Sequence, residues 1–199
     1  MFFLTQWLLI VAPFSVEAQM WTRAGRWEIF LFGQEMAGDE AHETIRGVNV
    51  NTIVDDFAVF GLGVGYNIDD YFGIKLDLFG GSTDLKIERG LVTFEEDMDV
   101  SGMDLNLDVN FFKGPFTPFV TGGIGFITFY EDFDDDDTYY YDGYDYSTSF
   151  SYNAGVGLRW EVTDHFFLKA LYRSTWSELE DTDETFQFDG FSMFAGYLF

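Results

Sequence analysis

The 199-residue chain has 35 acidic and 10 basic residues, giving a formal net charge of -25, and 21% of its residues are aromatic. This acidity argues against direct binding of nucleic acid or anionic lipid through a basic face, although it permits divalent cations as bridges. The chain has no cysteine, so disulfides are excluded, while 21 glycines against 3 prolines favour many strands joined by short turns in a single domain.

The first 18 residues form an apolar stretch that ends with Val16 and Ala18 at the small-residue positions of a signal-peptidase site. Residues 1–18 are therefore predicted to be a signal peptide, and residues 19–199 the mature domain. The basic region that usually opens such a peptide is missing, and an N-terminal core segment is the alternative. No later apolar run reaches the roughly 18 residues that a membrane-spanning helix needs.

From residue 25 onward, apolar and polar residues alternate with the period of two that is typical of strands. The alternation is clearest over residues 149–162, where Leu158 and Trp160 share one face and Arg159 and Glu161 share the other. Similar patterns predict eight strands, at residues 25–34, 54–67, 71–86, 98–112, 117–130, 148–162, 166–177 and 185–199.

The connections between these strands alternate in length. Short turns are predicted at residues 67–70, 113–116 and 163–165, and longer polar segments at residues 35–53, 87–97, 131–147 and 178–184. Short turns on one rim and long loops on the other are typical of bacterial outer-membrane barrels, whose short turns face the periplasm. The sequence therefore predicts an all-β fold: an eight-stranded antiparallel up-and-down transmembrane β-barrel in the cell outer membrane.

Alternation alone does not exclude a soluble, lipocalin-like barrel, whose apolar face points inward. The composition of the polar face favours the membrane barrel, because its charges nearly balance and buried charges are tolerated only in pairs. We expect a lumen charge network of four cations and five acids, formed by Glu28, Lys75, Asp77, Asp104, Asp108, Arg159, Glu161, Lys169 and Arg173. Lumen-side glycines are expected to leave space for these long side chains.

Aromatic residues on the apolar face fall near the strand ends, where the girdles of a membrane barrel lie. The predicted girdle toward the short turns contains Trp27, Tyr66, Phe72, Phe111, Trp160, Phe166 and Tyr197, and the girdle toward the long loops contains Tyr130, Tyr152 and Trp176.

Residues 25–199 resemble the small outer-membrane barrel families that include the OmpA barrel domain, OmpX and OmpW. The resemblance is carried by the glycine-rich stretches 61–67, 118–126 and 154–160, by Leu171-Tyr-Arg173 and by the terminal Ala195-Gly-Tyr-Leu-Phe199. It implies that the last strand holds a C-terminal signal for the barrel-assembly machinery, formed by Phe191, Met193, Ala195, Tyr197 and Phe199. It also implies outer-membrane lipid and lipopolysaccharide as partners.

The acidic, tyrosine-rich segment 131–145 falls on the predicted outer rim. Its carboxylates suit divalent cations such as Ca²⁺, but Asp137 stands where a calcium-binding loop of the EF-hand type needs glycine. A solvated acidic loop is the simpler interpretation, and an adhesive tyrosine surface is the alternative.

Neither of the two histidines predicts catalysis. His165 falls in a short turn, and His42 falls in the first outer loop without a nearby serine, so neither suits a hydrolytic site built on a rigid strand. We expect no enzymatic activity, no catalytic residues, no cofactor and no metal site.

Eight strands leave an interior that side chains fill, so the lumen charges are expected to plug it. The sequence thus predicts a structural or surface-interaction role. The alternative is a narrow channel or lateral conduit for small or apolar solutes, which is suggested by phenylalanines on the otherwise polar face: Phe30, Phe32, Phe79, Phe129, Phe167 and Phe194.

Overall fold

The computed structural model describes residues 21–38, 40–45, 48–89, 92–131, 146–178 and 185–199. These residues form ten strands: β1 (Trp27–Ala37), β2 (Glu40–Ile45), β3 (Val48–Val54), β4 (Phe57–Asn67), β5 (Phe72–Arg89), β6 (Val92–Asn110), β7 (Phe116–Glu131), β8 (Tyr146–Glu161), β9 (Phe166–Glu178) and β10 (Thr185–Leu198). No helix in the described part of the chain is long and apolar enough to cross a membrane. The predicted signal peptide, residues 1–18, lies outside the described residues.

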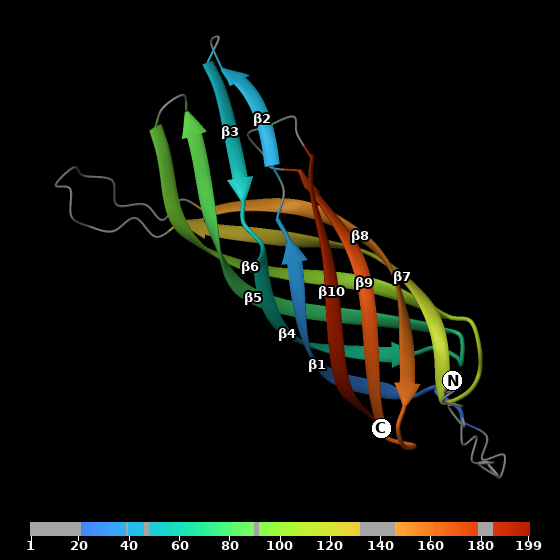
Figure 1. Cartoon of the computed structure of the whole chain (residues 1–199). Helices are drawn as coiled ribbons and strands as arrows, with labels where there is room; N and C mark the ends of the chain where they lie inside the picture. The colour runs from blue at the N-terminus through green and yellow to red at the C-terminus, as the bar shows by residue number, and fades with distance from the viewer. Residues whose placement is uncertain (1–20, 39, 46–47, 90–91, 132–145, 179–184) are drawn as a thin grey trace, which may run out of the picture.

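Eight of these strands close into an antiparallel barrel (Figure 1). Around the ring, β5, β4, β1, β10, β9, β8, β7 and β6 are neighbours in that order, and β6 pairs back onto β5. The first and last strands of the chain meet along a register that runs from Glu28 opposite Leu198 to Ala37 opposite Asp189. The predicted fold, an eight-stranded antiparallel barrel, is confirmed.

The barrel is apolar outside and polar inside, which is the reverse of a soluble barrel. On β8, Val156 and Leu158 are 60% and 46% exposed, whereas Arg159 is 1% exposed. On β5, Lys75 is 5% exposed beside outward-facing Ile74. Because exposed hydrocarbon on all eight barrel strands is stable only against lipid, the soluble alternative is excluded.

Two of the predicted loops are wrong, because the strands continue into them. Residues 35–53 were expected to form a polar loop, but they include the hairpin of β2 and β3, and β3 pairs with the outer end of β5 from Val54 opposite Leu85 to Val50 opposite Arg89. The segment 87–97 is also mostly strand, since β5 and β6 pair up to Arg89 opposite Val92. Main-chain hydrogen bonds form these extensions. Such bonds do not require apolar and polar residues to alternate, so the sequence pattern does not reveal the extra strands.

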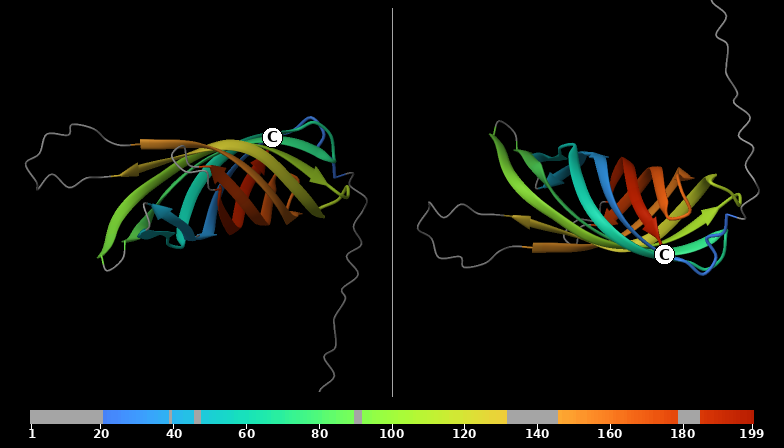
Figure 2. Two further views of the ribbon diagram at one scale, coloured as in Figure 1. Left: turned by 90° about the horizontal axis from the view of Figure 1, so that it is seen from above. Right: turned by 90° about the horizontal axis from the view of Figure 1, so that it is seen from below.

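The extensions project from one end of the barrel only. Strands β2 and β3 rise above the ring at the end opposite the C-terminus (Figure 1). Seen from above and from below, the β5–β6 hairpin, drawn in green, also extends from this end of the barrel (Figure 2). The short turns lie at the other end, which the general topology of outer-membrane barrels assigns to the periplasm.

Inward-facing glycines on β4 make room for the side chains of β1. A Cβ on Gly61 would overlap the ring of Phe32, and a Cβ on Gly63 would overlap the ring of Phe30. Gly65 makes room for a charged side chain as expected, because its Cβ would meet Glu28, and Gly125 on β7 does the same for Asp104. The glycines therefore admit aromatic rings to the lumen more than charged chains.

Candidate functional site

All nine charged residues predicted for the lumen lie on inward faces and are buried. They come from five strands: Glu28 from β1, Lys75 and Asp77 from β5, Asp104 and Asp108 from β6, Arg159 and Glu161 from β8, and Lys169 and Arg173 from β9. Their convergence follows from the period of two, which aims alternate side chains of every strand at one axis.

Glu28 is the centre of the larger group of ion pairs. Its carboxylate lies 2.9 Å from Lys75 Nζ, 2.9 Å from Arg159 Nη1 and 3.3 Å from Lys169 Nζ. Asp108 joins the group by contacting both lysines, with Lys169 Nζ at 3.2 Å. Two acids and three cations from five strands are thus linked across the lumen.

Arg173 organises a second group, one step closer to the long-loop rim. Its Nη1 lies 3.1 Å from Asp104 and 3.8 Å from Asp77, and its Nη2 donates to Gln34 Oε1 at 2.5 Å. Asn106 donates from Nδ2 to Asp77 at 2.8 Å. Two carboxylates on neighbouring strands therefore share one guanidinium.

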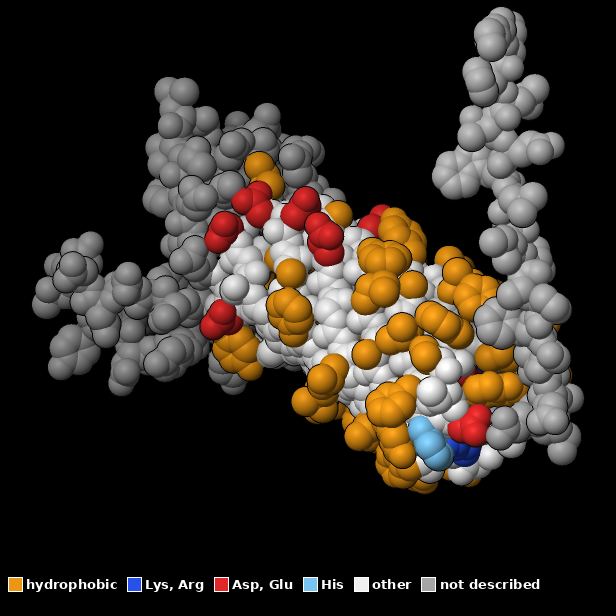
Figure 3. All heavy atoms as spheres, turned by 60° about the horizontal axis from the view of Figure 1, so that its bottom comes forward, with side chains coloured by type: hydrophobic (Ala, Val, Ile, Leu, Met, Phe, Trp, Pro, Cys, Tyr) orange, Lys and Arg blue, Asp and Glu red, His pale blue; other side chains and the backbone are white. Residues whose placement is uncertain are grey.

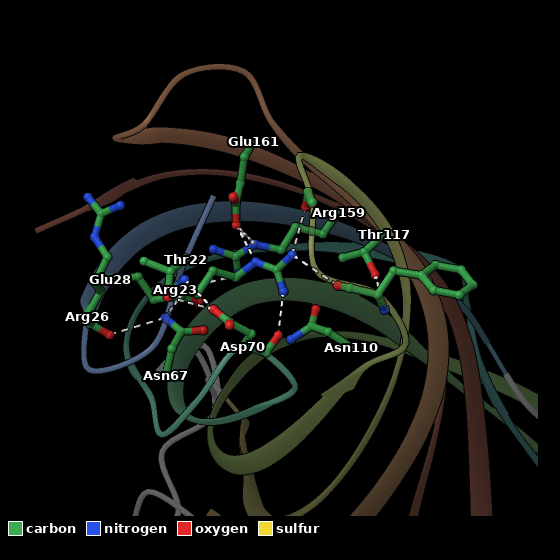
Figure 4. A network of polar contacts seen from close by, with 12 residues as sticks. Thr22, Arg23, Arg26, Glu28, Asn67, Asp70, Asn110, Thr117, Arg159 and Glu161 are labelled. Carbon is green, nitrogen blue, oxygen red and sulfur yellow. Dashed lines mark hydrogen bonds and ion pairs between the residues drawn. The ribbon is translucent and has the colours of Figure 1, made fainter. Parts of the chain in front are cut away.

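The residues before β1 close the short-turn end of the lumen, which sequence reasoning missed. Arg23 is 2% exposed and pairs with Glu161, and it also donates to the carbonyl oxygens of Asp70 at 2.7 Å and Gly114 at 2.8 Å. Figure 4 shows its guanidinium pointing into the barrel beside Arg159. The available signal was the expected network itself, whose five acids exceeded its four cations; Arg23 is the fifth cation.

Asp70, in the turn between β4 and β5, fastens this segment in place. Its carboxylate accepts hydrogen bonds from Thr22 Oγ1 at 2.8 Å and from the Arg23 backbone nitrogen at 2.9 Å, and lies 2.9 Å from Lys113 Nζ. Burial raises the pKa of Asp70, but the bonds from Lys113, Thr22 and the backbone outweigh it and lower the pKa to about 2. The same contact raises the pKa of Lys113.

Phenylalanines pack among and above the charges. The six that were expected on the polar face are all buried. Phe32 stacks on Phe194 with ring centroids 5.0 Å apart, and Phe30 meets Phe194 edge-on at 5.8 Å. Lys169 Nζ lies 5.5 Å from the centre of the Phe30 ring, so the aromatic layer contacts the ion pairs directly.

Toward the long loops, the described side chains that line the lumen carry no charge. They are apolar or bear hydroxyls: Met36, Val54, Phe57, Val59, Thr83, Met98, Val100, Ile127, Phe129, Ser149, Ser151, Thr175, Ser177, Phe186 and Phe188. The lumen therefore has a charged half at the short-turn end and a mainly apolar half at the loop end.

The histidines and the acidic residues that the structure describes form no evident catalytic or metal site. His165 lies in the turn before β9, where it was expected; the interpretation of His42 as a loop residue is wrong, because it lies on β2 opposite Asn51. Among the side chains that the structure describes, no three of His, Cys, Asp or Glu form a group that could hold a metal ion.

The residues of the expected C-terminal signal all face outward: Phe191, Met193, Ala195, Tyr197 and Phe199. Their recognition by the assembly machinery stays a prediction. Residues 132–145, most of the acidic segment, lie outside the described residues. Binding of divalent cations by this segment, and its alternative role as an adhesive tyrosine surface, therefore also stay predictions.

Comparison with known proteins now identifies this arrangement. The profile of the outer membrane protein β-barrel domain family matches residues 32–199. The chain belongs to this family. A comparison with curated proteins gives no match.

Solved structures of the outer membrane family share the fold. OprG of Pseudomonas aeruginosa has a TM-score of 0.65 at 17% identity, covering 88% of this chain and 96% of that one. Neisserial surface protein A has a TM-score of 0.60 at 13% identity, covering 87% and 97%. Ail of Yersinia pestis, in complex with the heparin analogue sucrose octasulfate, has a TM-score of 0.56 at 15% identity, covering 88% and 99%. At these identities the likeness shows the fold alone. The family match places the protein in the outer membrane.

Proposed function

We propose that the protein is a non-enzymatic barrel whose lumen is plugged toward the periplasm and whose loop-bearing end performs a structural or surface-interaction role. The observation that carries the proposal is the insertion of Arg23 beside Glu161, beneath the ion pairs of Glu28. A conducting path would have to separate these pairs. Leaving one buried charge without its partner costs about 3–5 kcal/mol.

The charges at the loop end support contact with a cationic partner or with divalent cations. The described part of that end bears exposed or half-buried acids at Asp55, Asp56, Asp84 and Asp99. Ail was solved with a polyanion, but acids of this kind would repel a polyanion, so the same ligand class does not suit this chain. Surface attachment by this protein would therefore use the opposite charge.

Planar-bilayer recording tests the plug. We expect the wild-type barrel to be silent, and the double variant Arg23→Ala/Arg159→Ala to show small conductance steps, because both cations that hold Glu161 are removed. Lys113→Ala removes a cation at the same rim but outside the lumen, so it should stay silent. Stepwise conductance in the wild type would contradict the plug.

Cell adhesion tests the surface role. Deleting residues 132–145 should weaken binding of cells to amine-coated beads, and adding Ca²⁺ should strengthen binding of wild-type cells to carboxylated beads. Adhesion that is the same with and without the segment would remove the surface role while leaving the plug intact.

A narrow conduit for apolar solutes is the second candidate, and the apolar outer half of the lumen favours it. Phe57 and Phe188 meet there edge-on with centroids 5.8 Å apart. If solutes enter this half, Phe188→Lys should slow uptake of an alkane-like fluorophore into reconstituted liposomes, while Phe191→Lys on the outer face should not. Equal uptake by the wild type, by Phe188→Lys and by protein-free liposomes would exclude the conduit.

A further inference from the structure

An apolar groove of about 570 Å³ runs along the outside of the barrel. It crosses β9, β10, β1, β4 and β5, and its walls include Ile29, Leu31, Leu62, Val64, Ala195 and Tyr197. The small Ala195 side chain lies opposite Leu31 and deepens the groove between β10 and β1. Its volume falls within the roughly 300–1,000 Å³ of sites that hold small organic ligands. Because this surface faces the bilayer interior, its natural occupant is a hydrocarbon chain.

A cationic group stands at the short-turn end of this groove. The His165 ring stacks on Tyr197 with centroids 5.3 Å apart, and Arg26 Nη2 lies 2.9 Å from His165 Nδ1. Arg26 is fixed by donating to the carbonyl oxygens of Asp164 at 2.7 Å and Leu198 at 3.1 Å. These bonds hold the guanidinium at the membrane interface, where Trp27 of the girdle follows it in sequence.

The placement of the basic residues singles out this end. Five of the 10 lie in the lumen, three are at positions 46, 86 and 89, whose side chains are not described, and the remaining two are Arg26 and Lys113. Both of these lie at the short-turn rim. Figure 3 shows a pale-blue histidine, a blue cation and one red acid side by side at the border of the orange hydrophobic surface, with several further red acids at the other end.

From this geometry we infer that the groove and Arg26 form a binding site for one phospholipid of the periplasmic leaflet. An acyl chain lies along Leu31 and Leu62, and the phosphate accepts hydrogen bonds from the Arg26 guanidinium, whose planar donors match phosphate oxygens. Lipopolysaccharide occupies the opposite leaflet, at the acidic end, so the lipid bound at the short-turn end is a phospholipid. This site is independent of the proposed plug and surface role.

Native mass spectrometry of the detergent-purified barrel with palmitoyl-oleoyl phosphatidylglycerol tests the site. We expect the wild type to retain one lipid. Arg26→Gln should weaken binding by roughly tenfold or more, because it removes a charge-assisted hydrogen bond. Ala195→Phe should weaken it similarly by filling the groove with a side chain that the lipid face tolerates.

Two matched variants control for general effects. Lys113→Gln removes the other rim cation, and Ala154→Phe adds the same ring to the outward face of β8, away from the groove; both should retain the lipid as the wild type does. Heat-modifiable gel mobility checks that each variant is folded. Equal loss or equal retention in all four variants would overturn the site, as would binding of inorganic phosphate or lipopolysaccharide in place of the phospholipid.

Discussion

Arg23 and Glu161 form a buried ion pair between the N-terminal segment and β8. A pair of this kind contributes little relative to apolar residues of the same shape, because burial removes both charges from water. Losing Arg23 is different, since buried Glu161 is then left with Arg159 as its remaining cation. Removing one partner should therefore destabilise the protein more than replacing both partners with apolar residues, and this difference can be measured.

Arg23→Ala is expected to lower the free energy of unfolding by about 1–3 kcal/mol, because it leaves buried Glu161 with Arg159 alone and removes the hydrogen bonds to the Asp70 and Gly114 carbonyl oxygens. The double variant Arg23→Met/Glu161→Leu should lose much less. Urea unfolding in detergent micelles, followed by tryptophan fluorescence, measures both. An equal loss in the single and double variants would show that the side chain of Arg23 matters through packing rather than charge.

Gly63 shows how a missing side chain shapes the lumen. Gly63→Ala should lower the free energy of unfolding by about 1–3 kcal/mol, because its Cβ would overlap the Phe30 ring and approach the Leu76 carbonyl oxygen. Gly122→Ala on β7 is the matched control, since its Cβ would meet nothing closer than Asn153 O at 3.7 Å. Equal effects in urea unfolding would mean that the general cost of replacing glycine dominates.

At the scale of elements, the Asp70 carboxylate joins the turn after β4 to the N-terminal segment by accepting hydrogen bonds from Thr22 and Arg23. The folded pKa of about 2 is lower than the ordinary 3.8, so ionised Asp70 stabilises this connection. This contribution is complete above about pH 4 and is lost as the pH falls through 2. Anchoring should therefore survive mild acid.

The amide signal of Arg23 in NMR spectra reports this titration, because its nitrogen donates to the Asp70 carboxylate. We expect a chemical-shift midpoint near pH 2. Asp70→Asn should abolish the titration, and a midpoint near 3.8 would show that the hydrogen bonds to Asp70 are not stabilising.

The β2–β3 hairpin should be dispensable for barrel closure. Gly38 N donates to Asp56 Oδ1 at 2.8 Å, and Met36 lies opposite Phe57, so the ends of β1 and β4 already meet beneath the hairpin. Deletion of residues 39–54 should leave a barrel whose gel mobility changes on boiling. Loss of that change would assign the hairpin a role in folding.

The accuracy of the sequence predictions differs between the two rims for a physical reason. At the short-turn rim, all eight predicted barrel strands begin or end within two residues of those observed; at the loop rim, β6 begins at Val92 rather than at residue 98. Apolar and polar residues alternate along a strand where one face contacts lipid and the other faces the lumen. Beyond the bilayer neither face contacts lipid, so the alternation is no longer required. The ion pairs followed from alternation, whereas Arg23 lies outside any strand.

At the scale of the whole molecule, the bilayer sets what the outer surface tolerates. Val156 lies midway between Trp160 and Tyr152 of the two aromatic girdles, while Thr148 on the same face lies beyond Tyr152. Val156→Arg should cost about 2–4 kcal/mol and Thr148→Arg about 0–1 kcal/mol. Equilibrium unfolding from liposomes measures the difference, and equal costs would mean that the membrane does not lie between these girdles.

The length of β6 sets how far the protein extends from the cell. It has 19 residues, and about 9–11 tilted residues cross a bilayer. At about 3.3 Å per residue, the remaining eight or so extend roughly 25 Å further along the strand. The outer part of β6 and its partner strand β5 would then be the first part of the protein that a ligand from the medium contacts. The lipid headgroups and the mouth of the lumen lie further in.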